Sequence, residues 1–133
     1  MPTRRLLLRL APAGVAAFLV APWPAVAGER RPFTAEAFAE AQAEGRPILV
    51  VVSAPWCPTC RAQRPHVDAA LADPRMAEAV LFEVDFDTQK DALRLLGARS
   101  QSTLIALRGT EERGRAVGIT DGARIRDLLL RAL

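Results

Sequence analysis

The feature that most constrains the fold is a short, uninterrupted apolar run, Ile48-Leu49-Val50-Val51-Val52, which follows Pro47. Four of its five residues are β-branched, and such residues favour strands. A strand with one face in water would alternate apolar and polar residues, but this run does not alternate. It therefore predicts a central strand covered on both faces, as in α/β proteins.

Helical and strand patterns alternate along the rest of the chain. Thr34, Thr88 and Asp121 are expected helix caps, and Gly97 is an expected helix stop. The order α-β-α-β-α-β-β-α implies parallel strands joined by helices, with an antiparallel hairpin near the end, in one domain of residues 28–133. The expected elements are helices over residues 34–44, 57–71, 88–96 and 121–130, and strands over residues 48–52, 80–86, 103–107 and 113–119.

The first residues have the pattern of a secretory signal peptide. Arg4, Arg5 and Arg9 flank an apolar run from Leu6 to Val20, and small residues follow at Ala25-Val26-Ala27. This run is shorter than the roughly 20 residues that a membrane-spanning helix needs, which argues against an anchor. We expect residues 1–27 to be removed and the remainder to act in the periplasm or elsewhere outside the cytoplasm. Sec and Tat export both remain open.

The net charge of the chain depends on that segment. The full sequence has 18 basic and 15 acidic residues, a formal net charge of +3. Three arginines and no acidic residue lie in residues 1–27, so the predicted mature domain has 15 of each sign. Basic patches are typical of proteins that bind nucleic acid or anionic membranes. We therefore expect neither partner, and no membrane insertion of the mature domain.

The chain has two cysteines, Cys57 and Cys60, separated by two residues. A disulfide that closes so short a loop constrains the unfolded chain little, so a purely structural bridge is disfavoured. Structural zinc sites usually have four ligands, and the only further candidate is His66. We therefore expect a redox-active pair without a metal ion. No nicotinamide, flavin or ATP motif is present, and we expect no cofactor.

The expected position of the pair at the start of a helix gives each cysteine a role. Free N–H groups and the helix dipole at that end favour a thiolate, so Cys57 is the expected nucleophile. We also expect Cys57 alone to lie at the exposed helix end. Cys60 follows one helical turn later, where it can attack the mixed disulfide and release the substrate. Pro58 lacks an N–H that could have stabilised the thiolate.

The segment from Ala54 to Arg61, Ala-Pro-Trp-Cys-Pro-Thr-Cys-Arg, with Pro65 five residues after the second cysteine, resembles the active site of the thioredoxin superfamily. The resemblance continues through Val84-Asp85-Phe86-Asp87, Ser102-Thr103-Leu104-Ile105 and Gly118, and covers nearly all of residues 34–133. It implies a thioredoxin-like α/β fold whose central mixed sheet is flanked by helices. We expect about four strands, because the first strand of the family is hard to find between Gly28 and Thr34.

The resemblance also implies a thiol-disulfide oxidoreductase. The Cys-Pro-Thr-Cys sequence resembles the reducing thioredoxin-like proteins of cytochrome c maturation. This favours a monomeric dithiol reductase that acts on disulfide-containing exported proteins and receives electrons from a membrane protein. Two alternatives remain: an oxidase that introduces disulfides, and a non-enzymatic module that binds Cu(I) or zinc through the cysteines.

Two positions beneath the expected active site depart from the family pattern. Thioredoxins usually carry a buried aspartate six positions before the first cysteine, where this chain has Val51. Glu83 stands where those proteins have a lysine. A half-buried carboxylate there could deprotonate Cys60 through a water, which makes Glu83 a third candidate catalytic residue. The alternative is an exposed glutamate without a role.

A third departure concerns substrate binding. The family has a cis-proline immediately before the position of Thr103, where this chain has Ser102. A cis bond before a residue other than proline costs about 2.5–4 kcal/mol, so we expect a trans bond after Gln101. Family substrates normally pair with the backbone at that preceding residue. The expected substrate-binding residues are Trp56, Pro58, Thr59, Gln101, Ser102 and Thr103.

Overall fold

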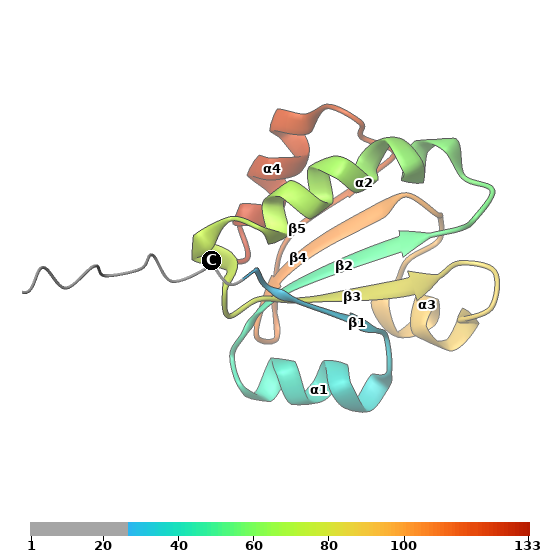
Figure 1. Cartoon of the computed structure of the whole chain (residues 1–133). Helices are drawn as coiled ribbons and strands as arrows, with labels where there is room; N and C mark the ends of the chain where they lie inside the picture. The colour runs from blue at the N-terminus through green and yellow to red at the C-terminus, as the bar shows by residue number, and fades with distance from the viewer. Residues whose placement is uncertain (1–26) are drawn as a thin grey trace, which may run out of the picture.

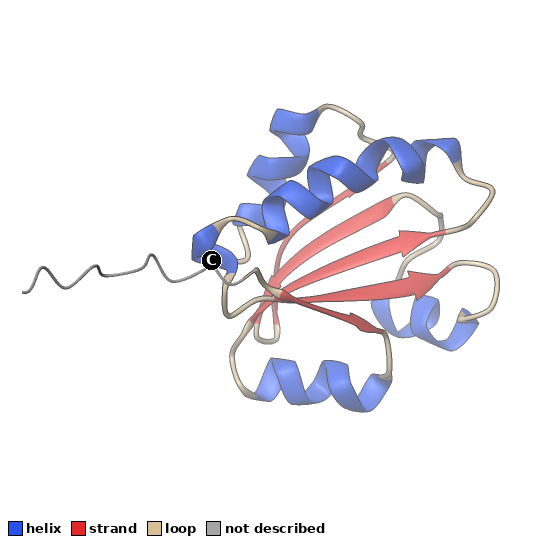
Figure 2. Ribbon diagram, viewed as in Figure 1, coloured by secondary structure: helices blue, strands red, loops and turns tan. Residues whose placement is uncertain are grey.

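The structure is a computed structural model that describes residues 27–133. The expected signal peptide, apart from Ala27, lies outside the described residues. Helices cover both faces of one sheet, as Figures 1 and 2 show. The elements in chain order are β1 (Glu29–Pro32), α1 (Ala35–Ala43), β2 (Pro47–Ser53), α2 (Pro58–Leu71), the short 3-10 helix η1 (Pro74–Met76), β3 (Val80–Asp85), α3 (Lys90–Leu96), β4 (Thr103–Arg108), β5 (Glu111–Val117) and α4 (Gly122–Leu130).

The sheet is mixed, with the strand order β1-β3-β2-β4-β5. β1, β3 and β2 are parallel, whereas β4 is antiparallel to β2, and β5 is antiparallel to β4. The closing hairpin therefore forms the antiparallel edge that the sequence predicted. This arrangement places β2 in the centre of the sheet and brings the carboxyl ends of β2 and β3 to the same side.

Two hydrophobic cores lie on opposite faces of the sheet. One core packs beneath α1 and α3 and includes Ile48, Val50 and Val52 of β2. The other lies against α2 and α4 and includes Leu49, with Val51 packed at its margin. Successive residues of β2 thus enter different cores, which confirms the strand covered on both faces.

Several expected helix ends are confirmed by their hydrogen bonds. The side chain of Thr34 accepts a bond from the N–H of Ala37 at 3.1 Å and begins α1. The side chain of Asp121 accepts from the N–H of Arg124 at 2.9 Å and begins α4. Gly97 ends α3 in a left-handed conformation, with φ of 61°.

The expected cap of α3 is wrong. Helix α3 begins at Lys90, and its N-cap residue is Gln89, which makes no capping bond with its side chain. Thr88 instead belongs to the preceding turn, where its N–H donates to Oδ1 of Asp85 at 3.0 Å. The aspartate, rather than the threonine, therefore organises this connection.

The sheet has five strands, whereas we expected about four. The additional strand, β1, pairs with β3 in parallel, with Arg30 opposite Leu81 and Pro32 opposite Glu83. Its sequence, Glu-Arg-Arg-Pro, carries no apolar alternation because β1 lies at the edge of the sheet and is mostly exposed. Backbone bonds such as Phe33 N–H to Glu83 O, at 2.9 Å, continue this pairing beyond the strand.

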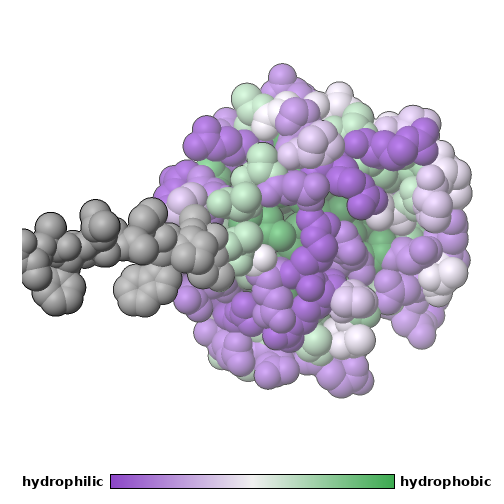
Figure 3. Space-filling view, in the orientation of Figure 1, coloured by the Kyte–Doolittle hydropathy of each residue, from purple (hydrophilic) through white to green (hydrophobic). Residues whose placement is uncertain are grey.

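The face of the described domain that is seen in Figure 3 is largely polar. Figure 3 shows charged and polar side chains over most of one face, with small apolar areas between them. Within residues 27–133 no helix combines the length and the hydropathy needed to cross a bilayer.

An aromatic cluster in the core beneath α1 provides a test of the fold. The ring centroids of Phe33, Phe38 and Phe82 lie 5.3 to 5.9 Å apart, and Phe82 is fully buried. We expect Phe82→Ala to lower the free energy of unfolding by about 3–5 kcal/mol, because it leaves a cavity in this cluster. Leu95→Ala, at a side chain 57% exposed, should cost less than about 0.5 kcal/mol. Urea denaturation of both variants would measure this, and equal losses would contradict the packing described.

Candidate redox site

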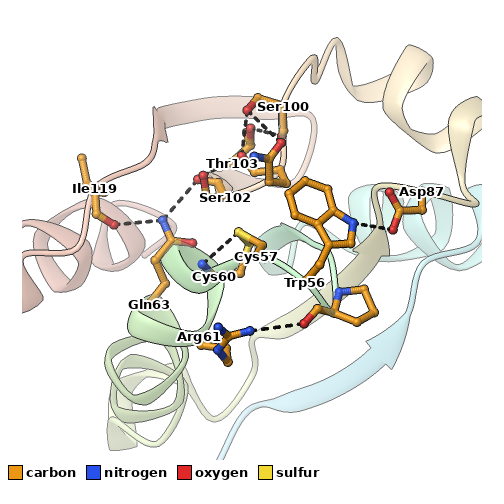
Figure 4. The surroundings of a disulfide bond; sticks show 12 residues. Trp56, Cys57, Cys60, Arg61, Gln63, Asp87, Ser100, Ser102, Thr103 and Ile119 are labelled. Carbon is orange, nitrogen blue, oxygen red and sulfur yellow. Dashed lines mark hydrogen bonds between the residues drawn. A yellow bond between two sulfur atoms is a disulfide. The ribbon is translucent and has the colours of Figure 1, made fainter.

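The cysteine pair lies where the central strand gives way to helix α2. β2 ends at Ser53, and α2 begins at Pro58 with Cys57 as its N-cap residue. The N–H of Cys57 donates to the carbonyl of Ala54 at 3.2 Å, which closes the turn between the two elements. Sγ of Cys57 accepts a bond from the N–H of Cys60 at 3.1 Å (Figure 4). The sulfur thus occupies the place of a capping oxygen, where N–H groups stabilise negative charge.

Cys57 and Cys60 form a disulfide, and their Cα atoms lie 5.3 Å apart. Cys57 is 2% exposed and Cys60 is 7% exposed, so our expectation that Cys57 alone lies at an exposed helix end is wrong for the oxidised form. The pair packs against Ala54 and Phe86 in a small apolar cluster of its own. The distinction between the cysteines therefore depends on the N-cap position of Cys57 rather than on exposure.

Trp56 and Pro58 are the exposed neighbours of Cys57. Trp56 is 54% exposed, and its indole N–H donates to Oδ2 of Asp87 at 2.9 Å (Figure 4). That bond fixes the ring while leaving much of its apolar surface free for a partner. Thr59, on the next position of α2, is half-buried. The side chains of Trp56, Pro58 and Thr59 therefore flank the disulfide.

The loop before β4 contains the position at which the family has a cis-proline. The bond between Gln101 and Ser102 is trans, and Ser102 has φ of 58°, which is unusual for a residue other than glycine. Its N–H donates to the carbonyl of Val52 at 2.8 Å, and its carbonyl accepts from the N–H of Gly118 at 3.0 Å. A proline could neither donate the first bond nor adopt this φ.

Hydroxyl groups hold the rest of this loop. The hydroxyls of Ser100 and Ser102 both donate to the carbonyl of Gln101, at 2.9 and 2.6 Å. The hydroxyl of Thr103 donates to the carbonyl of Ser100 at 2.7 Å. Ser102 and Thr103 are buried and Gln101 is half-buried, so Gln101 is more accessible than the two residues that follow it.

Glu83 lies beneath the disulfide, on the strand adjacent to β2. It stands opposite Val51 in the register of β2 and β3. Glu83 and Cys60 line the same small cavity of about 20 Å³, although the Glu83 side chain is 41% exposed. Arg30 of β1 forms ion pairs with both Glu83 and Asp68. Glu83 therefore lies near Cys60 with a partly exposed carboxylate, and its cationic partner Arg30 was not foreseen.

Two further residues of the site were missed by the sequence analysis. Gln63 is 1% exposed, and its side-chain amide lies beside the cysteine pair and the loop of Ser102 (Figure 4). Its position, three residues after Cys60 and four before buried Val67, places it on the buried face of the helix, and this spacing could have identified it. Asp87, whose Oδ2 accepts the indole N–H of Trp56, was assigned no role in the site from the sequence. The turn before α3 is held by Asp85, whose Oδ1 accepts from the N–H of Asp87 at 2.8 Å.

No group of three or more histidine, cysteine or acidic side chains within residues 27–133 is arranged to hold a metal ion. His66, the third metal ligand considered from the sequence, lines a different cavity with Gly122 and Arg126, next to the start of α4.

Comparisons with known proteins agree with this geometry. A sequence profile of the family described as Thioredoxin matches residues 30–131. Thioredoxin H2-2 of Oryza sativa subsp. japonica is 32% identical over 73 residues, which are 53% of this chain and 52% of that protein. The match thus spans about half the length of that relative.

Solved structures extend the comparison to most of the described domain. The crystal structure of Trxlp from Edwardsiella tarda is 40% identical and covers 76% of this chain and 98% of that one, with a TM-score of 0.73. A mutant thioredoxin from Halobacterium salinarum (20% identity, 80% and 93% coverage, TM-score 0.66) and the Malassezia sympodialis thioredoxin (15% identity, 85% and 97% coverage, TM-score 0.70) share the fold. The fold, the paired cysteines at the start of α2 and the match over residues 30–131 together show that this chain belongs to the thioredoxin family.

Proposed function

We propose that this chain is a thiol-disulfide oxidoreductase of the cell envelope that reduces disulfides in other exported proteins. The observation that carries the proposal is the position of Cys57 Sγ at the N-cap of α2, where it accepts the N–H of Cys60 at 3.1 Å. A sulfur held in this way is suited to exist as a thiolate, and Cys60 is already within disulfide distance.

The reaction has two exchange steps. In the first, the Cys57 thiolate attacks one sulfur of the substrate disulfide, forms a mixed disulfide and releases the other substrate sulfur as a thiolate, which takes up a proton. In the second, Cys60 loses its proton and attacks Cys57 Sγ, which forms the Cys57–Cys60 disulfide and releases the second substrate thiolate. The protein thereby loses two electrons to the substrate. A dithiol of a membrane protein would return them.

The cellular setting of this proposal comes from the sequence. The basic, apolar and small-residue pattern of residues 1–27 supports export, and the Cys-Pro-Thr-Cys sequence supports the reducing direction through its resemblance to reductants of cytochrome c maturation. The exposed surface of Trp56, next to Cys57, is the apolar contact that we propose for substrate proteins.

Glu83 is the group that we propose to assist the second step. It lines the cavity that Cys60 also lines, and a volume of about 20 Å³ has room for about one water. The proton of Cys60 could pass through such a water to the carboxylate, which is open to solvent on its other side. Arg30, paired with Glu83, would hold the carboxylate in place.

Single cysteine variants would test the two roles. Cys60→Ser should accumulate as a mixed disulfide with its substrate, because the resolving sulfur is absent. Cys57→Ser should trap no substrate and have no turnover, because Cys60 lacks the N-cap position. Mass spectrometry after incubation with a disulfide-containing protein would measure trapping, and equal trapping by both variants would overturn the assignment.

The direction of electron flow would be tested by the reduction potential. A reductase of this family should lie nearer the roughly −270 mV of thioredoxin than the roughly −120 mV of a strong oxidant. Equilibration of the purified protein with glutathione and dithiothreitol redox buffers would measure the potential. A value close to that of the strong oxidant would favour the alternative function, an oxidase that introduces disulfides.

The role of Glu83 would be tested by separating the two chemical steps. Glu83→Gln should slow the attack of Cys60 on the mixed disulfide by about 10²-fold, the scale expected for lost acid-base assistance, and affect the first step less. Rapid mixing of the reduced variant with substrate measures both rates.

Asp68→Asn is the matched control, because Asp68 also pairs with Arg30. If the second step is slowed because an ion pair of Arg30 is lost, and not because the Glu83 carboxylate is lost, Asp68→Asn will be impaired as much as Glu83→Gln. A native rate for Glu83→Gln between pH 6 and 8 would exclude the proposed proton transfer.

A further inference from the structure

Gln63 is a buried polar side chain that neither step of the proposed reaction uses. It belongs to α2, one turn after Cys60, and is 1% exposed. A buried amide normally forms hydrogen bonds through both its nitrogen and its oxygen. No donor among the described residues reaches Oε1 of Gln63, which is the only buried side-chain nitrogen or oxygen atom there without a partner. Such an atom at a redox site calls for a physical explanation.

The orientation of the amide is fixed by its nitrogen. Nε2 donates to the carbonyl of Ile119 at 2.9 Å and to the carbonyl of Ser102 at 3.2 Å. The reverse orientation would place Oε1 against two carbonyl oxygens, so the assignment of nitrogen and oxygen is determined. In Figure 4 the nitrogen faces Ser102 and Ile119, while the oxygen lies on the side of the cysteine pair.

Cys60 is the neighbour of Gln63 whose capacity to donate a hydrogen bond changes with redox state. Gln63 and Cys60 line the same cavity of about 20 Å³, and of its other lining residues, which include Ser53, Arg30 and Arg64, none gains a hydrogen when the disulfide is reduced. In the disulfide form described here, Cys60 has no hydrogen to donate. In the dithiol form it carries an S–H, which is a weak donor.

We propose that Gln63 is a positioning residue that favours the reduced state: in the dithiol form the Cys60 S–H donates a hydrogen bond to Oε1, while Nε2 continues to hold the loop of Ser102. This inference rests on the proposed function only in requiring that the pair cycles between dithiol and disulfide. It does not depend on the direction of electron flow in the cell.

The energetic consequence is a shift of the redox equilibrium. Reduction by two glutathione molecules adds two electrons and two protons to the Cys57–Cys60 disulfide and produces glutathione disulfide. A buried acceptor without a partner is costly, and reduction supplies its partner. Gln63 therefore destabilises the disulfide relative to the dithiol, and its removal should make the disulfide harder to reduce.

Gln63→Met tests this with little change in side-chain size. We expect its equilibrium constant for reduction by glutathione or dithiothreitol to be about tenfold lower than that of the wild type, which corresponds to a potential about 30 mV more negative. Urea unfolding of both redox forms should show the same difference, with the reduced form losing more stability than the oxidised form.

Val67→Ala is the control, because Val67 is buried, lies one turn further along α2, lines the same cavity and has no hydrogen-bonding group. It should weaken both redox forms alike and leave the equilibrium constant within about twofold of the wild type. An unchanged constant for Gln63→Met would overturn the inference. That is also the result expected if a bound water satisfies Oε1 in both redox states.

A second measurement leaves Gln63 unchanged, so it tests the inference even if the Gln63→Met protein does not fold. The Cys57→Ser protein retains Cys60 as its one thiol, and its S–H stretching band in the infrared spectrum should lie below the frequency of a free thiol. A band at the free-thiol frequency would overturn the inference. If the wild-type Cys57–Cys60 pair has a reduction potential as high as that of a disulfide-forming oxidase, the proposed reductase is contradicted. The change in potential expected for Gln63→Met would not be affected by that result.

Discussion

The burial of β2 on both faces and along both edges is the constraint on which the rest of the structure depends. β2 pairs with β3 on one side and with β4 on the other, and its side chains enter both cores. The end of such a strand has little freedom, so the turn from Ala54 to Trp56 and the first residues of α2 begin from a fixed point. Cys57 therefore meets the free N–H groups of the helix without a mobile loop between the core and the sulfur.

The loop of Ser102 is held to that same strand end. A residue other than glycine with φ near +58° costs on the order of 1–3 kcal/mol, and surrounding bonds must offset this. Val52, Gly118 and Gln63 supply them through the N–H and carbonyl of Ser102. Where the family has a proline with a rigid ring, this chain has Ser102, whose backbone is held by hydrogen bonds to neighbouring residues. This explains how a serine can keep the loop before β4 in one place.

The parts of the fold that were predicted correctly are those that local chemistry determines. The unalternating run of β2, the caps Thr34 and Asp121 and the αL position of Gly97 each have a signature within a few residues. β1 was missed because an edge strand is held by backbone pairing, which leaves no apolar pattern in Glu-Arg-Arg-Pro. Missing β1 also hid Arg30, since its contact with Glu83 joins residues 53 positions apart. The low exposure of Cys57 likewise arises from tertiary packing against Phe86.

The charges beneath the disulfide are displaced by one strand relative to the pattern that thioredoxins usually show. The position on β2 where thioredoxins carry an acid is occupied by Val51, and the position on β3 where they carry a lysine is occupied by Glu83. The cation of this chain is Arg30, on β1. Neighbouring strands lie roughly 4.8 Å apart, so the carboxylate starts from a backbone position one strand away from the one that leads to the cysteines. This is why the proposed proton transfer from Cys60 uses a water in the cavity that Glu83 and Cys60 both line. The same displacement brings the carboxylate to the surface, where, in the proposed second step, solvent would receive the proton.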